Sequence, residues 1–76
     1  MTPHQYANEW CEKRGYCLIA LITSKHICEA SKLNALIIDM RLFHWFKWPE
    51  IAEVVHRSKG YCRAVWKESR MKARAA

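Results

Sequence analysis

Residues 48–66 read WPEIAEVVHRSKGYCRAVW. Pro49 suits the first turn of a helix, where a backbone N–H is not needed, and Ser58 suits the residue that caps the next helix. The apolar residues between and after these signals recur at helical spacing, and Ala52 offers the small side chain that two crossing helices need at their contact. The stretch therefore predicts two helices joined by a tight turn, with the spacing of a helix-turn-helix, although a plain helical hairpin fits the same spacing.

The rest of the chain also reads as helices with short breaks. Pro3 favours the start of a first helix and Gly15 its end. The apolar run at residues 16–22 is expected to be a short buried helix, because no second strand is available to pair with it. A polar joint at residues 23–26 leads into the longest helix. The predicted helices cover residues 3–13, 16–22, 28–46 and 50–56 and the segment after Ser58.

The length of 76 residues leaves room for one domain with a modest core. Hydrophobic residues make up 51% of the chain and include four tryptophans, which is enough to fill that core. Trp45, Trp48 and Trp66 flank or occupy apolar faces, so we expect them in the core rather than as platforms on which bases stack. The sequence thus predicts a single all-α domain over residues 1–76, a small bundle of four to five helices.

The net charge of +6 arises entirely in the last 20 residues. Residues 1–56 contain six Lys or Arg and six Asp or Glu, whereas residues 57–76 contain seven Lys or Arg against Glu68 alone. Five of these cations recur at steps of three or four and so share one helical face. They are Lys59, Arg63, Lys67, Arg70 and Arg74. A helix with a row of cations suits a polyanion, most commonly nucleic acid; a solvated terminal helix with ordinary surface charges is the alternative.

A neighbouring face of the same segment carries Cys62, Val65, Trp66 and Ser69 at positions i, i+3, i+4 and i+7. That face is suited to packing on the rest of the domain. The segment therefore has an anchoring side and a cationic side.

Other functional classes find little support in the sequence. The four cysteines are expected to be reduced and buried as small hydrophobic residues, and they lack a C-x-x-C spacing. Only His26 and Cys28 lie close in sequence among potential zinc ligands, so we expect no metal and no cofactor. No nucleophile has a recognisable partner, so we expect no enzyme. No apolar run could span a bilayer and no secretory signal is visible, which favours a cytoplasmic protein without a membrane partner.

The segment Trp48-Pro49-Glu50-Ile51-Ala52, followed by Arg57-Ser58-Lys59-Gly60-Tyr61-Cys62, resembles the C-terminal DNA-binding domain of the bacterial replication initiator DnaA. That family has a Leu-Pro-Glu-Ile-Gly segment and then an Arg-Asp-His-Thr-Thr-Val signature that opens the recognition helix. Leu21-Ile22-Thr23-Ser24-Lys25-His26 is similar to the family's upstream Leu-Leu-Ser-Lys-Arg-Arg. The resemblance covers roughly residues 6–70. It concerns the DNA-binding module alone, since no phosphate-binding loop for a nucleotide is present.

The resemblance, together with the charge pattern, implies a role for each candidate residue. Ser58, Lys59 and Tyr61 are placed to meet base edges in the major groove, and Gly60 leaves room for a close approach of the backbone. These residues replace the family's Asp-His-Thr-Thr, so the preferred DNA site should differ from the initiator's own. The residues expected to contact phosphates are Arg57, Arg63, Lys67 and Arg70, and those expected at the flanking backbone or minor groove are Lys25 and His26.

The sequence therefore predicts a small, sequence-preferring protein that binds double-stranded DNA and regulates replication or transcription. Two alternatives remain open. In the first, the protein is a homodimeric transcription regulator with exposed aromatic residues such as Trp10 or Phe46 at its interface. In the second, the fold has lost DNA binding and serves as an adaptor for a protein partner, for instance in replication or defence machinery.

Overall fold

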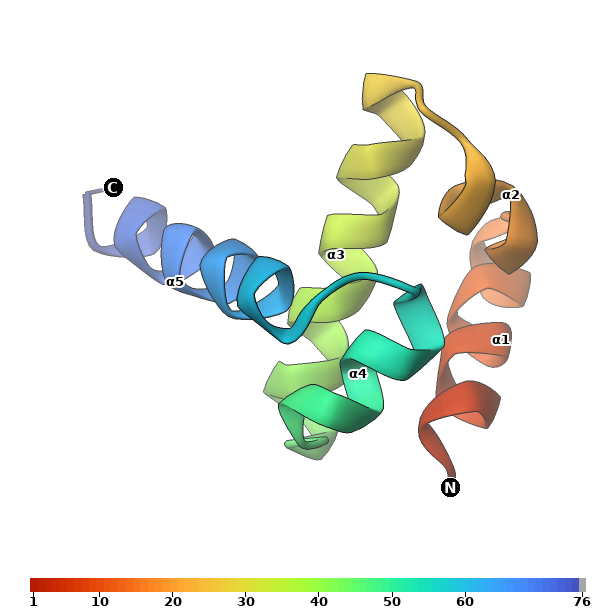
Figure 1. The fold of residues 1–76 in the computed structure, drawn as a ribbon, viewed down its shortest axis with the longest axis horizontal. Helices are drawn as coiled ribbons and strands as arrows, with labels where there is room; N and C mark the ends of the chain where they lie inside the picture. The colour runs from red at the N-terminus through yellow and green to blue at the C-terminus, as the bar shows by residue number, and fades with distance from the viewer. Residues whose placement is uncertain (76) are drawn as a thin grey trace.

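The computed structural model describes residues 1–75, with side chains described through residue 71. Every regular element in this part of the chain is a helix (Figure 1). The helices are α1 (Pro3–Arg14), α2 (Leu18–Thr23), α3 (Ile27–His44), α4 (Trp48–Val55) and α5 (Lys59–Ala75). The predicted all-α class and the number of helices are confirmed.

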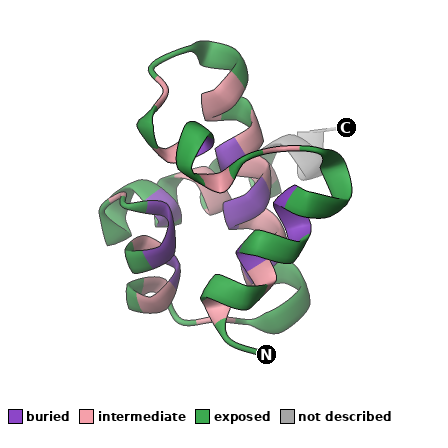
Figure 2. Cartoon of the chain, turned by 90° about the vertical axis from the view of Figure 1, so that its right-hand side faces the viewer, coloured by how far each residue is buried: buried purple, intermediate pink, exposed green. Residues whose placement is uncertain are grey.

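Helix α3 is the centre of the molecule and packs against each of the other four helices. Figure 1 shows α1 and α5 on opposite sides of it. Burial is confined to the inward faces of the helices, as Figure 2 shows, and each large aliphatic side chain buried there stabilises the fold by about 1.5–3 kcal/mol. The buried side chains are Ala7, Trp10, Cys11, Leu21, Leu33, Leu36, Ile37, Met40, Ile51, Val54, Val55 and Cys62.

Local signals explain where α1 begins and ends. The Thr2 hydroxyl accepts a hydrogen bond from the Gln5 N–H at 3.1 Å, and the Gln5 side chain accepts one from the Thr2 N–H at 3.0 Å, which forms a capping box. Gly15 ends the helix in the left-handed conformation, with φ at 72°. The predicted first helix is thus confirmed and extends one residue further, to Arg14.

Other helix boundaries differ from the prediction. Helix α3 ends at His44 rather than at residue 46, because Trp45 takes the left-handed conformation and its N–H bonds the Arg41 carbonyl at 3.1 Å. Helix α4 begins at Trp48, ahead of Pro49, because the missing proline N–H has no helical partner in a first turn anyway. Helix α2 forms, but over Leu18–Thr23 rather than residues 16–22, and it is not buried as a whole, since only Leu21 of its residues is buried and Ile19 is 71% exposed.

The tryptophans are distributed differently from the expectation. Trp45 is 62% exposed, so its assignment to the core was wrong, and Trp48 and Trp66 are only half-buried. Trp10 lies in the core instead, where its indole N–H donates to Asp39 Oδ2 at 2.8 Å. Phe46 packs against the core. Trp10 and Phe46 are therefore not the exposed aromatic residues that a homodimer would require.

All four cysteines are free thiols, but only two are buried. Cys11 and Cys62 lie in the core, whereas Cys17 and Cys28 are exposed, contrary to the expectation that all four are buried. Within the described part of the chain, every helix is too short or too polar to cross a membrane.

Candidate nucleic-acid interface

The connection between α4 and α5 consists of three residues with well-defined backbone geometry. His56 adopts the left-handed conformation, with φ at 54°, and its N–H bonds the Ala52 carbonyl, which ends α4. The Ser58 hydroxyl then accepts a hydrogen bond from the Tyr61 N–H at 3.0 Å and caps the first turn of α5, as the sequence predicted. Because both ends are fixed by hydrogen bonds, α5 leaves α4 in one defined direction.

Arg57, the middle residue of this connection, is bonded within the fold. Its Nη1 donates to the carbonyls of Val55 and His56 at 3.4 and 3.2 Å, and its Nη2 donates to the carbonyl of Ile22 at 3.2 Å. These bonds satisfy carbonyls at the end of α4 and tie the end of α2 to the connection. The structure thus gives the guanidinium a positioning function that the sequence prediction, a phosphate contact, did not foresee.

The cations of α5 share its exposed face. Lys59, Arg63, Lys67 and Arg70 are all exposed, and the Arg74 side chain lies outside the described residues. Among the side chains that are described, none of these four forms an ion pair. The Arg70 guanidinium instead lies over the Trp66 ring, 5.4 Å from its centroid. The four positive charges in this row therefore have no ion-pair partner among the described side chains.

The opposite side of α5 holds the helix in place. Cys62 is fully buried, Val65 packs against the core, and Ser69 is half-buried. Helix α5 packs on both α3 and α4 through this side. The predicted division into an anchoring face and a cationic face is confirmed.

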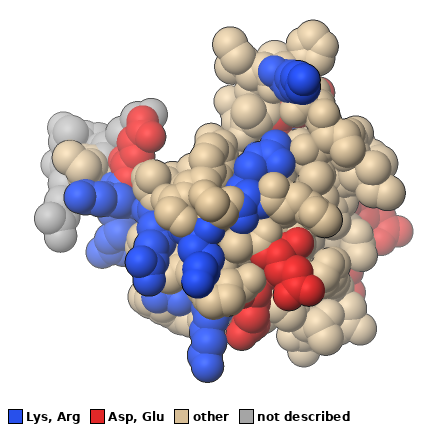
Figure 3. All heavy atoms as spheres, viewed as in Figure 1, with Lys and Arg blue, Asp and Glu red and all other residues tan. Residues whose placement is uncertain are grey.

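Figure 3 shows how these charges appear on the molecular surface. Lys and Arg side chains gather over α5 and near the start of α4, with an acidic side chain beside them over α5, and a further group of Asp and Glu side chains lies to their right in the same view. The first turn of α5 contains no acidic residue, so the positive end of the helix dipole adds to the charge of Lys59. The start of α5 is therefore positively charged.

The candidates for base contacts differ in availability. Lys59 is exposed, and a Cβ placed on Gly60 would meet only Ser58 Oγ, at 3.9 Å, so the backbone there is open to solvent. Tyr61, however, donates its hydroxyl hydrogen to Asn34 Oδ1 at 2.7 Å, and Ser58 serves as the helix cap. Two of the three predicted base-reading side chains are thus engaged within the protein.

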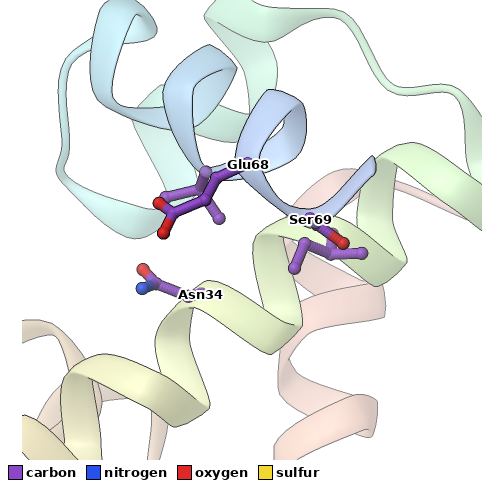
Figure 4. Close-up of a pocket in the computed structure, with 5 residues that line it drawn as sticks. Asn34, Glu68 and Ser69 are labelled. Carbon is purple, nitrogen blue, oxygen red and sulfur yellow. The ribbon is translucent and has the colours of Figure 1, made fainter. Parts of the chain in front are cut away.

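A small hollow of about 260 Å³ lies between α3 and α5, next to Asn34. Asn34 and Glu68 face each other across it, and Ser69 lies further along α5 (Figure 4). The hollow is on the flank of α5 that faces α3. The carboxylate of Glu68, which lines it, would repel a phosphate. The hollow therefore borders the cationic face without belonging to it.

Lys25 and His26 are exposed in the joint between α2 and α3. Figure 1 places this joint at the top of the molecule, apart from α5. The structure does not bring these two residues together with the cationic face, so a contact from them would reach a separate part of a ligand.

The described residues show no group of three His, Cys, Asp or Glu side chains placed to hold a metal ion. Burial raises the pKa of the Cys11 and Cys62 thiols, which keeps both protonated at neutral pH. Comparisons with protein-family models, curated proteins and solved structures found no match for the chain.

The partners that fix this surface could not be predicted from the sequence. Asn34 and Ile22 lie 27 and 35 residues from the side chains that bond them, and no local pattern reveals such pairs. The contact between Arg41 and Trp45 could have been predicted from the sequence, because the two residues are four apart at the end of a helix.

Proposed function

We propose that this chain is a small protein that binds double-stranded DNA through the cationic face of α5 and regulates replication or transcription. The observation that carries the proposal is the row of four exposed cations on one face of α5, Lys59, Arg63, Lys67 and Arg70, which lacks carboxylate partners in the described structure. Each contact between such a cation and a phosphate releases condensed counterions from the duplex, which favours binding.

The shape of the α4–α5 pair supports the same proposal. The major groove admits one α-helix, and in helix-turn-helix proteins the second helix enters it with its N-terminal residues against the bases. Here the N-terminal turn of α5 is exposed at Lys59 and Gly60, while α4 and α3 hold its other side. The resemblance of residues 48–62 to the DNA-binding domain of DnaA points in the same direction.

In this proposal Arg63, Lys67 and Arg70 contact phosphates and set the position of the protein on the duplex. Lys59 contacts base edges, and Gly60 allows the backbone to approach the groove. Ser58 and Tyr61 support the helix rather than read bases, because their hydroxyls are already engaged. Lys25 and His26 contact the flanking backbone or minor groove.

A salt titration of binding to a random-sequence duplex tests the proposal. The three phosphate contacts of Arg63, Lys67 and Arg70 predict that log K falls with log salt at a slope of about −3. Arg63→Ala and Lys67→Ala should each reduce the magnitude of this slope by about one. Lys13→Ala removes the same charge from the exposed surface of α1 and should leave the slope unchanged. Absence of binding at low salt would contradict the proposal.

A second candidate function is a protein-binding adaptor on the same fold. The engagement of Ser58 and Tyr61 within the protein favours it, because only Lys59 then remains to read bases. The adaptor proposal predicts no duplex binding at low salt, so the same titration separates the two functions.

A further inference from the structure

Three tryptophans and two arginines form a cluster beside the cationic face of α5. Trp45 and Trp48 each lie edge-on to Trp66, with ring centroids 6.3 and 6.4 Å apart. The Arg41 guanidinium lies over both Trp45 and Trp48, 4.7 Å from each centroid, and Arg70 lies over Trp66. We call these five residues the tryptophan cluster. Trp66 lies three residues after Arg63 and four before Arg70, so the cluster adjoins the proposed phosphate contacts.

Trp45 is the exposed member of the cluster and has an unusual backbone conformation. Its φ of 53° is unfavourable for a bulky residue, and helices commonly end with glycine or asparagine at such a position. Two hydrogen bonds hold this turn: the Trp45 N–H bonds the Arg41 carbonyl, and Arg41 Nη1 donates to the Phe46 carbonyl at 3.0 Å. The Trp45 indole is not part of the hydrophobic core, since the residue is 62% exposed. The turn therefore presents an aromatic ring to solvent in a fixed position.

The charges of the cluster define what it attracts. Neither Arg41 nor Arg70 forms an ion pair within the described residues, and Arg41 Nε is buried there without a hydrogen-bond partner. A hollow of about 260 Å³ beside the cluster is lined by Trp66, Lys67, Arg70 and Met71. An indole flanked by unneutralised cations favours a ligand with a flat aromatic ring and a negative charge.

Two other occupants fit this surface less well. A second copy of the chain would bring two proteins of net charge +6 together through a cationic surface. An acidic peptide would neutralise the arginines but leave the exposed ring of Trp45 without a stacking partner. A nucleotide supplies both the ring and the phosphate.

We propose that the tryptophan cluster stacks an unpaired base next to the duplex that α5 binds, so that the protein prefers a junction between double-stranded and single-stranded DNA. This inference rests on the proposed function. It adds a subsite for single-stranded DNA at the edge of the α5 surface that is proposed to bind duplex DNA.

Fluorescence-anisotropy titrations with a blunt duplex and with the same duplex carrying a six-nucleotide dT tail test the inference. Stacking of one base predicts that the tail raises the affinity about tenfold. Trp45→Asn should abolish this gain and leave the affinity for the blunt duplex unchanged. Asparagine is the substitution of choice because it tolerates the left-handed conformation, so the variant should keep the backbone of this turn.

Two matched variants complete the experiment. Phe43→Ala removes another exposed aromatic ring, 65% exposed on the last part of α3 but outside the cluster, and should keep the full gain from the tail. Trp45→Phe retains an aromatic ring and should keep part of the gain.

The possible results are distinguishable. Equal affinity of the wild-type protein for the tailed and blunt duplexes, or a gain that survives Trp45→Asn, would overturn the inference and leave the proposed function standing. Failure to bind either DNA at low salt would overturn the proposed function itself. A third result would also overturn the inference: the tail gives no gain in affinity, but the wild-type protein binds an oligo-glutamate peptide and Trp45→Asn abolishes that binding. The cluster would then be assigned to a protein partner.

Discussion

Arg57 joins two parts of the chain that are 35 residues apart. Its guanidinium supplies hydrogen bonds to the ends of both α2 and α4, where carbonyls have no partner within their own helix. Hydrogen bonds from a charged donor stabilise a fold more than neutral ones do. Arg57 is therefore a positioning residue, which keeps the start of α5 in place relative to the rest of the molecule.

Arg57→Ala is expected to lower the free energy of unfolding by about 1–3 kcal/mol, because carbonyls at two helix ends lose their donor. Urea denaturation followed by circular dichroism measures the change. Arg63→Ala is the control: this exposed cation has no ion pair in the described structure, and its loss should change stability by less than about 0.5 kcal/mol. Equal losses for the two variants would contradict the positioning role.

Lys59 is the exposed side chain nearest to the start of α5 and the best remaining candidate for a base contact. A lysine there can donate to the guanine acceptors of the major groove. Lys59→Ala should weaken binding by about 1–3 kcal/mol on a site selected from randomised duplexes, but far less on random DNA. The variant should remain folded, since removing a cation from the first turn favours the helix dipole. Equal losses on both DNAs would make Lys59 a phosphate contact.

At the scale of the element, α5 combines a packed side and a charged side in one helix. Its packed side rests on α3 and α4, and its start depends on the Ser58 cap. The cap lies at the same end of the helix that the proposed function places in the groove. A substitution that changes the charge of the cap residue, Ser58, but keeps its hydrogen bond therefore separates the effect on DNA binding from the effect on helix stability.

Ser58→Asp is expected to keep the cap and to favour the helix dipole, so its thermal stability should equal or exceed that of the wild type. The new carboxylate should nevertheless weaken binding to duplex DNA, because it would face phosphates. Ser58→Ala is the counterpart: it should lose about 1 kcal/mol of stability without adding a charge. If Ser58→Asp left DNA affinity unchanged, the start of α5 would lie outside the interface.

Across the whole molecule, the helices were predictable where local signals mark their ends. Pro3, Gly15 and Ser58 act through backbone geometry and hydrogen bonds within a few residues, so their effects are visible in the sequence. Which tryptophans are buried could not be predicted from the sequence. Trp10 packs in the core, where Asp39, 29 residues away, accepts its N–H, whereas Trp45 is turned outward at the left-handed end of α3. A small core cannot take every apolar residue, and tertiary packing decides which ones remain outside.

The candidate site was predictable to the same extent. The cationic face of α5 follows from helical periodicity alone, since Lys59, Arg63 and Lys67 need only a regular helix to line up. The engagement of Tyr61 depends on Asn34 in a different helix, and so it required the fold.

In the proposed function, α5 carries the surface that binds duplex DNA. The most direct test follows the backbone amide resonances of the isotopically labelled protein during titration with a short random-sequence duplex at low salt. The claim predicts that the largest shifts fall on the exposed positions of residues 58–71, while those of α1 and α2 stay nearly constant. Shifts concentrated on α1, or no shifts at all, would contradict it.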